Sequence, residues 1–121
     1  PSRERSAELL ARRIAARDDR GEPAFVTGDF NVGETNPALV PLVGTAAAPG
    51  RFVDAFRVMA PAATEAGTFT AFDPARTTGD KIDYVLVPRG TEVLGAAIVR
   101  TARNGRLPSD HFPVTARVRL K

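Results

Sequence analysis

The chain has 121 residues, of which 43% are hydrophobic and 26% are charged, so it is long enough for one domain with a buried core. It contains no cysteine, which excludes disulfides, zinc–thiolate sites and cysteine nucleophiles. No apolar run approaches the roughly 20 residues of a membrane-spanning helix, and no signal peptide is visible. A net charge of +3 suits a phosphate-bearing substrate, but a basic surface kept for solubility explains it equally well.

The N-terminal segment has the period of an amphipathic helix. Small and aliphatic residues recur at helical spacing from Ala7 to Ala15, and arginines and glutamates fill the opposite face. Ser2 is a candidate N-cap, and Gly21 lies just past the expected end of the helix.

A strand and a short helix are expected next. Residues 23–27 form an apolar stretch of strand length that runs into residues 28–31, where polar side chains interrupt the hydrophobic pattern. Asn36 followed by Pro37 is typical of an N-cap and a first helical turn, so a short helix is expected through Val43.

The second half of the chain changes from a helical to an extended pattern. Residues 51–59 predict one more short helix, and Gly95 marks a possible bulge. Strands are expected over residues 68–72, 81–87, 91–100 and 114–120. The order helix–strand–helix followed by strands indicates one α/β unit with helices packed on a mixed sheet.

Asp29 and Asn31 form the first polar cluster. Residues two apart in an extended chain point to the same side, so both side chains can face one ligand. A carboxylate can bind a hard cation or take a proton from water, and an amide can donate to a phosphate oxygen. An Asx-type turn after a strand explains the same two residues equally well.

Asp83 is the centre of the second cluster. Alternation along its strand places Asp83 on the same face as Val85 and Val87. A carboxylate among aliphatic side chains is costly to bury unless it is paired, and its most useful partner would be a histidine. The simpler interpretation is a surface ion pair with Lys81.

The third cluster is Ser109-Asp110-His111, just before the last strand. His111 is the only histidine of the chain and directly follows a carboxylate. Histidine is the side chain best suited to proton transfer near neutral pH. Viewed alone, however, a histidine in a loop is more often simply solvated.

Taken together, the motifs GDFN, DAFR, TF, KIDYV and PSDHFPV, in this order, resemble the C-terminal half of the endonuclease/exonuclease/phosphatase (DNase I-like) superfamily. That superfamily includes nucleases, deadenylases, sphingomyelinases and inositol-polyphosphate 5-phosphatases. The resemblance implies an α/β fold for residues 1–121: the C-terminal half of a four-layer α/β sandwich, with one mixed, mainly antiparallel sheet and helices on one face. The N-terminal half of the domain would be missing.

The resemblance also implies a site for Mg²⁺ or Mn²⁺. Asp29 would orient and activate the attacking water and would belong to the metal site with Asn31 and Asp110. The principal metal-binding glutamate of the family has no counterpart before the GDFN motif, and is expected in the missing N-terminal half.

Further residues are implied to act on the substrate. His111 would contact the scissile phosphate and stabilise its developing charge, with Asp83 holding the imidazole ring in orientation. Asn31 would hold a non-bridging phosphate oxygen. Phe69 falls where family members often place an aromatic ring near the substrate, although a place in the core explains it at least as well.

The function implied for the intact protein is metal-dependent hydrolysis of phosphoester bonds, as a phosphodiesterase, nuclease or phosphatase. The substrate would be a nucleic acid, a phospholipid headgroup or a small phosphoester. The chain alone is expected to be nearly inactive and to bind its missing half, or itself, through the sheet face that the missing half would cover. The alternatives are a non-catalytic interaction module that keeps the fold and a stable proteolytic fragment.

Overall fold

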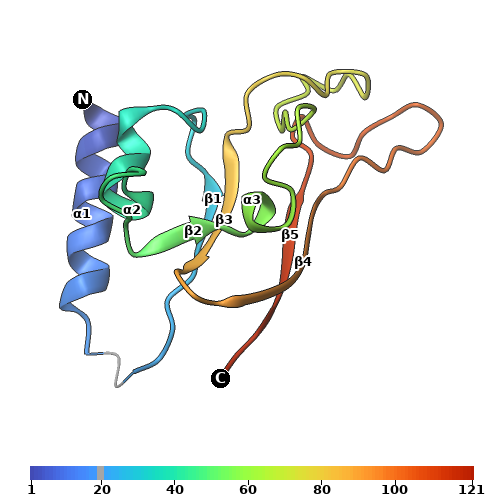
Figure 1. Ribbon diagram of the computed structural model, residues 1–121. Coiled ribbons are helices and arrows are strands. Elements are labelled where there is room, and N and C mark those ends of the chain that lie inside the picture. Colours follow the sequence, from blue (N-terminus) through green and yellow to red (C-terminus); the bar gives the residue numbers. More distant parts are fainter. Residues whose placement is uncertain (19–20) are drawn as a thin grey trace.

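A computed structural model describes residues 1–18 and 21–121 (Figure 1). The described helices all lie before residue 60 and the three longest strands all lie after residue 80, as the sequence predicts. The elements are α1 (Ser2–Ala16), β1 (Val26–Asp29), the 3₁₀ helix η1 (Pro37–Leu39), α2 (Val40–Val43), β2 (Phe52–Asp54), α3 (Ala55–Met59), β3 (Asp83–Pro88), β4 (Glu92–Ile98) and β5 (Val114–Arg119).

The predicted N-cap of η1 is confirmed, and the predicted N-cap of α1 is wrong. Asn36 caps η1, because its side-chain oxygen accepts a 2.9 Å hydrogen bond from the backbone N–H of Ala38. Ser2 is not the N-cap of α1. It is the first helical residue, and Pro1 precedes it without a side-chain capping bond.

Residues 51–59 do not form one helix as predicted. Phe52 and Val53 pair with Pro88 and Val87 of β3, so the segment begins as strand β2. Asp54 then ends the strand and caps α3, because its Oδ1 accepts a 3.0 Å hydrogen bond from the N–H of Phe56. The pairing with β3 therefore overrides the local helical pattern of the first residues.

Strand β3 is the centre of a three-stranded antiparallel sheet with the order β1-β3-β2. Strands β4 and β5 form a separate antiparallel pair, with the expected bulge at Gly95. The sheet is therefore divided, and its described ladders are all antiparallel. The reason is that both edges of β3 are already occupied by β1 and β2, so that β4 pairs with β5 instead.

Residues 68–72 are not a regular strand. Only Phe69 makes a ladder contact, as an isolated bridge to His111. Ala71 and Phe72 have φ angles of 50° and 66°, in the left-handed region, which ends the extended conformation.

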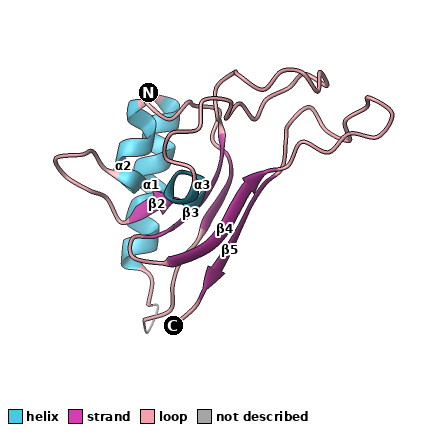
Figure 2. Ribbon diagram, turned by 45° about the vertical axis from the view of Figure 1, so that its right-hand side comes forward, coloured by secondary structure: helices cyan, strands magenta, loops and turns pink. Residues whose placement is uncertain are grey.

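The helices α1 and α2 cover one face of the three-stranded sheet, as expected. In both views they lie on one side of this sheet and the β4–β5 pair lies on the other (Figures 1 and 2). Ala11 and Ile14 of α1 pack against the main core. The buried residues of that core are Val26, Val32, Ala38, Leu39, Leu42, Phe52, Tyr84 and Leu86. The helical cover positions β1 and β3, whose ends carry two of the three polar clusters.

Candidate active site

The register of the central sheet brings two of the predicted site residues face to face. Asp29 is the last residue of β1 and Asp83 is the first residue of β3, and they are direct partners in the antiparallel ladder. Like charges directly opposite each other destabilise a strand pair. A positive group between the two carboxylates would relieve that repulsion.

A short pairing of two loops delivers His111 to this point. The backbone N–H of Phe112 donates to the carbonyl of Thr68 (2.8 Å), and the N–H of Thr70 donates to the carbonyl of Asp110 (2.7 Å). These bonds flank the bridge between Phe69 and His111. The third polar cluster is therefore tied to the segment just before β3.

Two buried threonines, which sequence reasoning missed, fix this arrangement. Thr68 Oγ1 accepts hydrogen bonds from the N–H groups of Ile82 (2.9 Å) and Asp83 (3.2 Å). Thr70 Oγ1 donates to the carbonyl of Asp110 at 2.9 Å. Both residues are fully buried. Their only sequence signal is the Thr-Phe-Thr alternation, which places two hydroxyls on the face opposite Phe69.

The predicted pairing of Asp83 with a histidine is confirmed. His111 Nδ1 lies 2.8 Å from Asp83 Oδ2, and Nε2 lies 3.8 Å from Asp29 Oδ2. The ring is thus placed between the two opposed carboxylates, with its side chain 25% exposed. The hydrogen bond to Asp83 is the main cause that raises the pKa of His111. The charges of Asp83, Asp29 and Asp110 act in the same direction, and partial burial opposes them.

Lys81 does not form the surface ion pair with Asp83 that the sequence allowed. Its side chain is fully buried, and its Nζ lies 2.9 Å from Asp54 Oδ2. The ammonium also donates to the backbone carbonyl of Asp83 (2.7 Å) and lies 3.8 Å from the ring centroid of Tyr84. Burial lowers the pKa of Lys81, and Asp54 opposes that change. Lys81 therefore supports the start of β3 from inside the protein.

Asn31 is reached by a turn and not by a continued strand. Strand β1 ends at Asp29, and Asn31 has a φ of 52°, so the alternation of an extended chain does not apply to this pair. The N–H of Asn31 donates to Asp29 Oδ1 at 2.8 Å, which is the Asx-type turn that the sequence also allowed. Both residues nevertheless line one open cleft of about 320 Å³ beside the first turns of α1.

Phe69 lies at the site and not in the main core. Its ring is half-buried and meets the His111 ring edge-on, with 5.3 Å between the ring centroids. The guanidinium of Arg76 lies 5.1 Å from the Phe69 centroid. Phe69 can therefore contact both the imidazole ring and a ligand bound beside it.

A group of possible metal ligands is present in the described residues. Ligand atoms of Asp29, Asp83 and His111 all lie within 4.8 Å of one another. Asp110 is not part of this group, although its charge acts on His111. Carboxylate oxygens suit a hard cation such as Mg²⁺, which needs about six ligands. The residues therefore fit part of such a site, and further ligands would have to come from elsewhere.

An imidazole oriented by one carboxylate and facing a second is suited to acid–base chemistry. Residues 1–111 match the model of the endonuclease/exonuclease/phosphatase family, and the chain belongs to that family of phosphoesterases and nucleases. Among curated proteins there is no match.

Solved structures with the same fold come from several organisms. A mannosyl-6-phosphatase of Bacteroides thetaiotaomicron is 28% identical with a TM-score of 0.75, over 98% of this chain and 46% of that one. A functionally unknown conserved protein of Enterococcus faecalis is 26% identical with a TM-score of 0.75, over 98% and 44%. The APE2 catalytic domain of Xenopus laevis is 28% identical with a TM-score of 0.71, over 95% and 42%.

The chain spans less than half the length of these solved structures. Among its described residues, no helix combines the length and the apolar character needed to cross a membrane.

Proposed function

We propose that this chain supplies one half of the active site of a divalent-metal-dependent phosphoesterase. The observation that carries the proposal is the alignment of Asp83, His111 and Asp29 at the end of the central sheet, with distances of 2.8 and 3.8 Å along the series. Family membership supports a phosphoester substrate.

In this proposal His111 is the group that contacts the scissile phosphate. Its Nδ1 is engaged by Asp83, so Nε2 is the nitrogen that is directed to a ligand. The raised pKa keeps more of the imidazole protonated near neutral pH, and an imidazolium N–H can donate to an oxygen on which negative charge develops. Asp83 then acts by fixing the orientation of the ring.

Asp29 and Asn31 are the proposed metal-side residues, and the family resemblance adds Asp110, which is not part of the group of converging ligand atoms. A bound Mg²⁺ or Mn²⁺ would supply Lewis-acid stabilisation of the phosphate and help to ionise a water. Asp29 is 36% exposed and can hold a proton from that water, while the Asn31 amide can donate to a phosphate oxygen. Phe69 would limit the space beside the phosphate.

The remaining ligands are proposed to come from a segment outside this chain, including the glutamate expected from the family resemblance. This chain covers less than half of each of these solved relatives, which supports the division. The isolated chain should therefore bind the cation weakly and hydrolyse phosphoesters slowly, and the complete protein should be active.

The test is hydrolysis of bis-p-nitrophenyl phosphate and plasmid DNA with Mg²⁺ or Mn²⁺, measured on the chain and on the complete protein. His111→Ala should lower the activity of the complete protein by at least about 100-fold. Asp83→Asn should lower it by about 10-fold. Thr115→Ala, on the exposed face of β5, is the matched control and should change nothing. An inactive complete protein would favour a non-catalytic interaction module.

A further inference from the structure

A basic hairpin arm, residues 101–108, projects from the body of the protein between β4 and β5 (Figure 1). Arg103 and Arg106 exchange both backbone hydrogen bonds, at 3.0 and 2.9 Å, around a two-residue turn. The turn residues Asn104 and Gly105 have φ angles of 51° and 71°, as a tight type I′ turn requires. The turn therefore gives the arm a defined shape.

Gly105 is present for its backbone conformation. A Cβ built at this position would meet no atom within 4 Å, so packing does not require a glycine there. The positive φ does require it, since other residues adopt this region only at a cost. The sequence thus keeps the arm tightly turned although no atom of the described residues lies within 4 Å of the Gly105 Cβ position.

The tight turn holds two positive charges together. Directly opposed residues of an antiparallel pair place their side chains on the same face, and like charges there are destabilising. Arg103 and Arg106 are both exposed, and neither has an ion-pair partner within residues 1–18 and 21–121. An anion between the two guanidinium groups would remove this repulsion.

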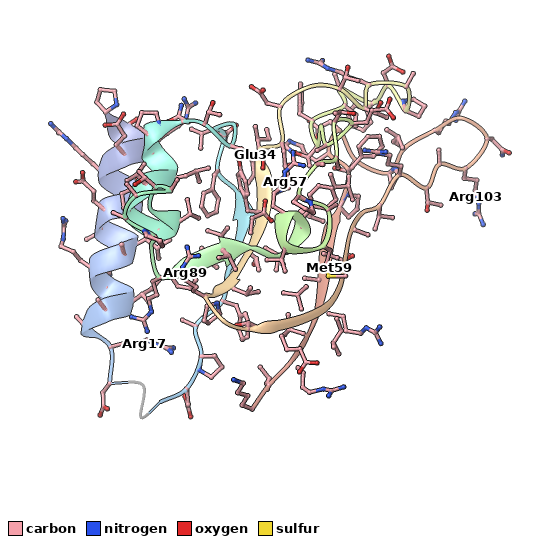
Figure 3. All side chains as sticks on the ribbon, in the orientation of Figure 1. Arg17, Glu34, Arg57, Met59, Arg89 and Arg103 are labelled. Carbon is pink, nitrogen blue, oxygen red and sulfur yellow. The ribbon has the colours of Figure 1, made fainter. Side chains whose placement is uncertain are left out.

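Two other arginines, in contrast, are engaged by groups of the protein itself. Arg57 forms two hydrogen bonds with the carboxylate of Glu34, at 2.7 and 2.8 Å. Arg89 donates to backbone carbonyls, including that of Gly50. In Figure 3 Arg57 and Arg89 lie over the body of the protein, whereas Arg103 lies out on the arm.

The arm is also connected to the candidate active site. Arg106 precedes His111 by five residues, so their Cα atoms lie within about 18 Å of each other even for a fully extended chain. The segment that joins them is fixed, because the N–H of His111 donates to Ser109 Oγ at 3.1 Å and the Asp110 carbonyl is bound by Thr70. The span between the two positions is therefore at most about 18 Å, which one extended ligand with several phosphates can cover.

We propose that Arg103 and Arg106 bind a second, non-scissile phosphate of a substrate that carries several phosphates. The inference rests on the proposed function for the position of the first phosphate. Guanidinium groups are suited to phosphate because their planar donors can pair with two oxygens. The arm contains no aromatic residue, so it contacts phosphates and does not stack on bases. A polynucleotide and a small polyphosphate both offer this chemistry.

The test is equilibrium binding to the full 121-residue chain, by fluorescence anisotropy of a labelled single-stranded oligonucleotide and by competition with inositol hexakisphosphate. Removing two exposed charge contacts in Arg103→Ala/Arg106→Ala should weaken binding about ten-fold. For the oligonucleotide, it should also reduce the slope of log Kd against log salt concentration by about 1.4. Phenyl phosphate, with one phosphate, should compete equally well in both proteins.

Arg12→Ala/Arg13→Ala is the matched control. It removes the same charge from the exposed face of α1, on the opposite side of the molecule, and should leave binding unchanged (Figure 1). Arg103→Lys/Arg106→Lys should keep the salt slope and lose part of the affinity. A ten-fold loss for only one of the two ligands identifies the phosphate source and supports the proposal.

Unchanged binding of both ligands by Arg103→Ala/Arg106→Ala would overturn the inference, as would an equal loss in the α1 control. Because binding does not require hydrolysis, either proposal can be contradicted while the other stands. A complete protein that binds through the arm but never hydrolyses phosphoesters would overturn only the proposed function.

Discussion

At the scale of single residues, His111 lies between two carboxylates that the sheet register places opposite each other. Asp83 is the nearer, at 2.8 Å, and its side chain is 13% exposed; Asp29 is at 3.8 Å and is 36% exposed. The nearer and more buried carboxylate should have the larger effect on the pKa of the imidazole, because solvent screens its charge less. The two neighbours can be separated experimentally because the chain has one histidine.

We predict that Asp83→Asn lowers the pKa of His111 and that Asp29→Asn lowers it less. Asp83→Asn replaces the charged acceptor of the His111 Nδ1 hydrogen bond by a neutral amide, and that hydrogen bond is the largest cause of the raised pKa. The measurement is an NMR titration of the imidazole, which gives a single curve. Equal midpoints in the wild-type protein and Asp83→Asn would contradict this ordering.

The same ion pair should make stability depend on pH. The folded-state pKa of His111 is raised above its unfolded value of about 6.5, so the stabilisation is fully present below that pH. It is lost as the pH rises through the raised folded-state pKa. The difference in unfolding free energy between wild type and Asp83→Asn, from urea titrations, should be larger at pH 5 than at pH 9. A difference that grows with pH would refute the assignment.

At the scale of elements, one buried ion pair joins β3 to the start of α3. Lys81 donates to the Asp83 carbonyl and pairs with Asp54, which in turn caps α3. Asp54 Oδ2 is buried, and the Lys81 ammonium at 2.9 Å is the group that compensates its charge. Breaking one partner of such a pair is more costly than replacing both.

We predict that Lys81→Met destabilises the protein by about 3–5 kcal/mol, because it leaves the Asp54 carboxylate buried and unpaired. Lys81→Met/Asp54→Asn should recover part of that loss, since asparagine keeps a side-chain oxygen for the α3 cap. Urea denaturation of the four proteins of the double-mutant cycle measures the coupling. Additive losses would show that the two residues act independently.

A turn glycine provides a second prediction at this scale. Gly44 has a φ of 71°, and a Cβ there would lie 2.1 Å from the backbone N of Gly50. Gly90 has a φ of 89° but no atom within 4 Å of its Cβ position. Gly90→Ala should therefore cost only the conformational strain of about 1–2 kcal/mol, and Gly44→Ala should cost clearly more. Thermal unfolding of the two variants makes the comparison, and a similar cost for both would contradict the steric argument.

At the scale of the whole molecule, the two sheets differ in how well they are covered. The three-stranded sheet contributes Val26, Phe52, Tyr84 and Leu86 to the main core. The β4–β5 pair contributes no fully buried residue, although its apolar and polar side chains alternate cleanly in β5. A two-stranded pair needs packing against further elements to be stable, so the half-covered face of β4–β5 favours a partner.

We predict that the isolated chain self-associates as its concentration rises, unless the proposed second half of the domain is present. Val118→Lys, on the half-buried face of β5, should reduce the association, and Thr115→Lys, on its exposed face, should not. Sedimentation velocity over a wide concentration range tests this, with circular dichroism to check that both variants fold. A chain that stays monomeric throughout would contradict the prediction.

Local patterns in the sequence determined the elements whose causes lie within a few residues. The period of α1, the Asn36 cap, the bulge at Gly95 and the alternation of β5 are of this kind. The three polar clusters were also found, because polar side chains at strand ends interrupt the hydrophobic pattern. The order of their motifs was enough to predict the family.

Only the tertiary structure decided which distant groups meet. The register that opposes Asp29 and Asp83, the burial of Lys81 and the hydroxyl bonds of Thr68 join residues far apart in the chain. Strand pairing likewise replaced the predicted start of a helix at Phe52. Local propensities are worth fractions of a kcal/mol per residue, and burial and long-range pairing outweigh them. The sequence therefore determined the types of residue in the site, and packing determined their geometry.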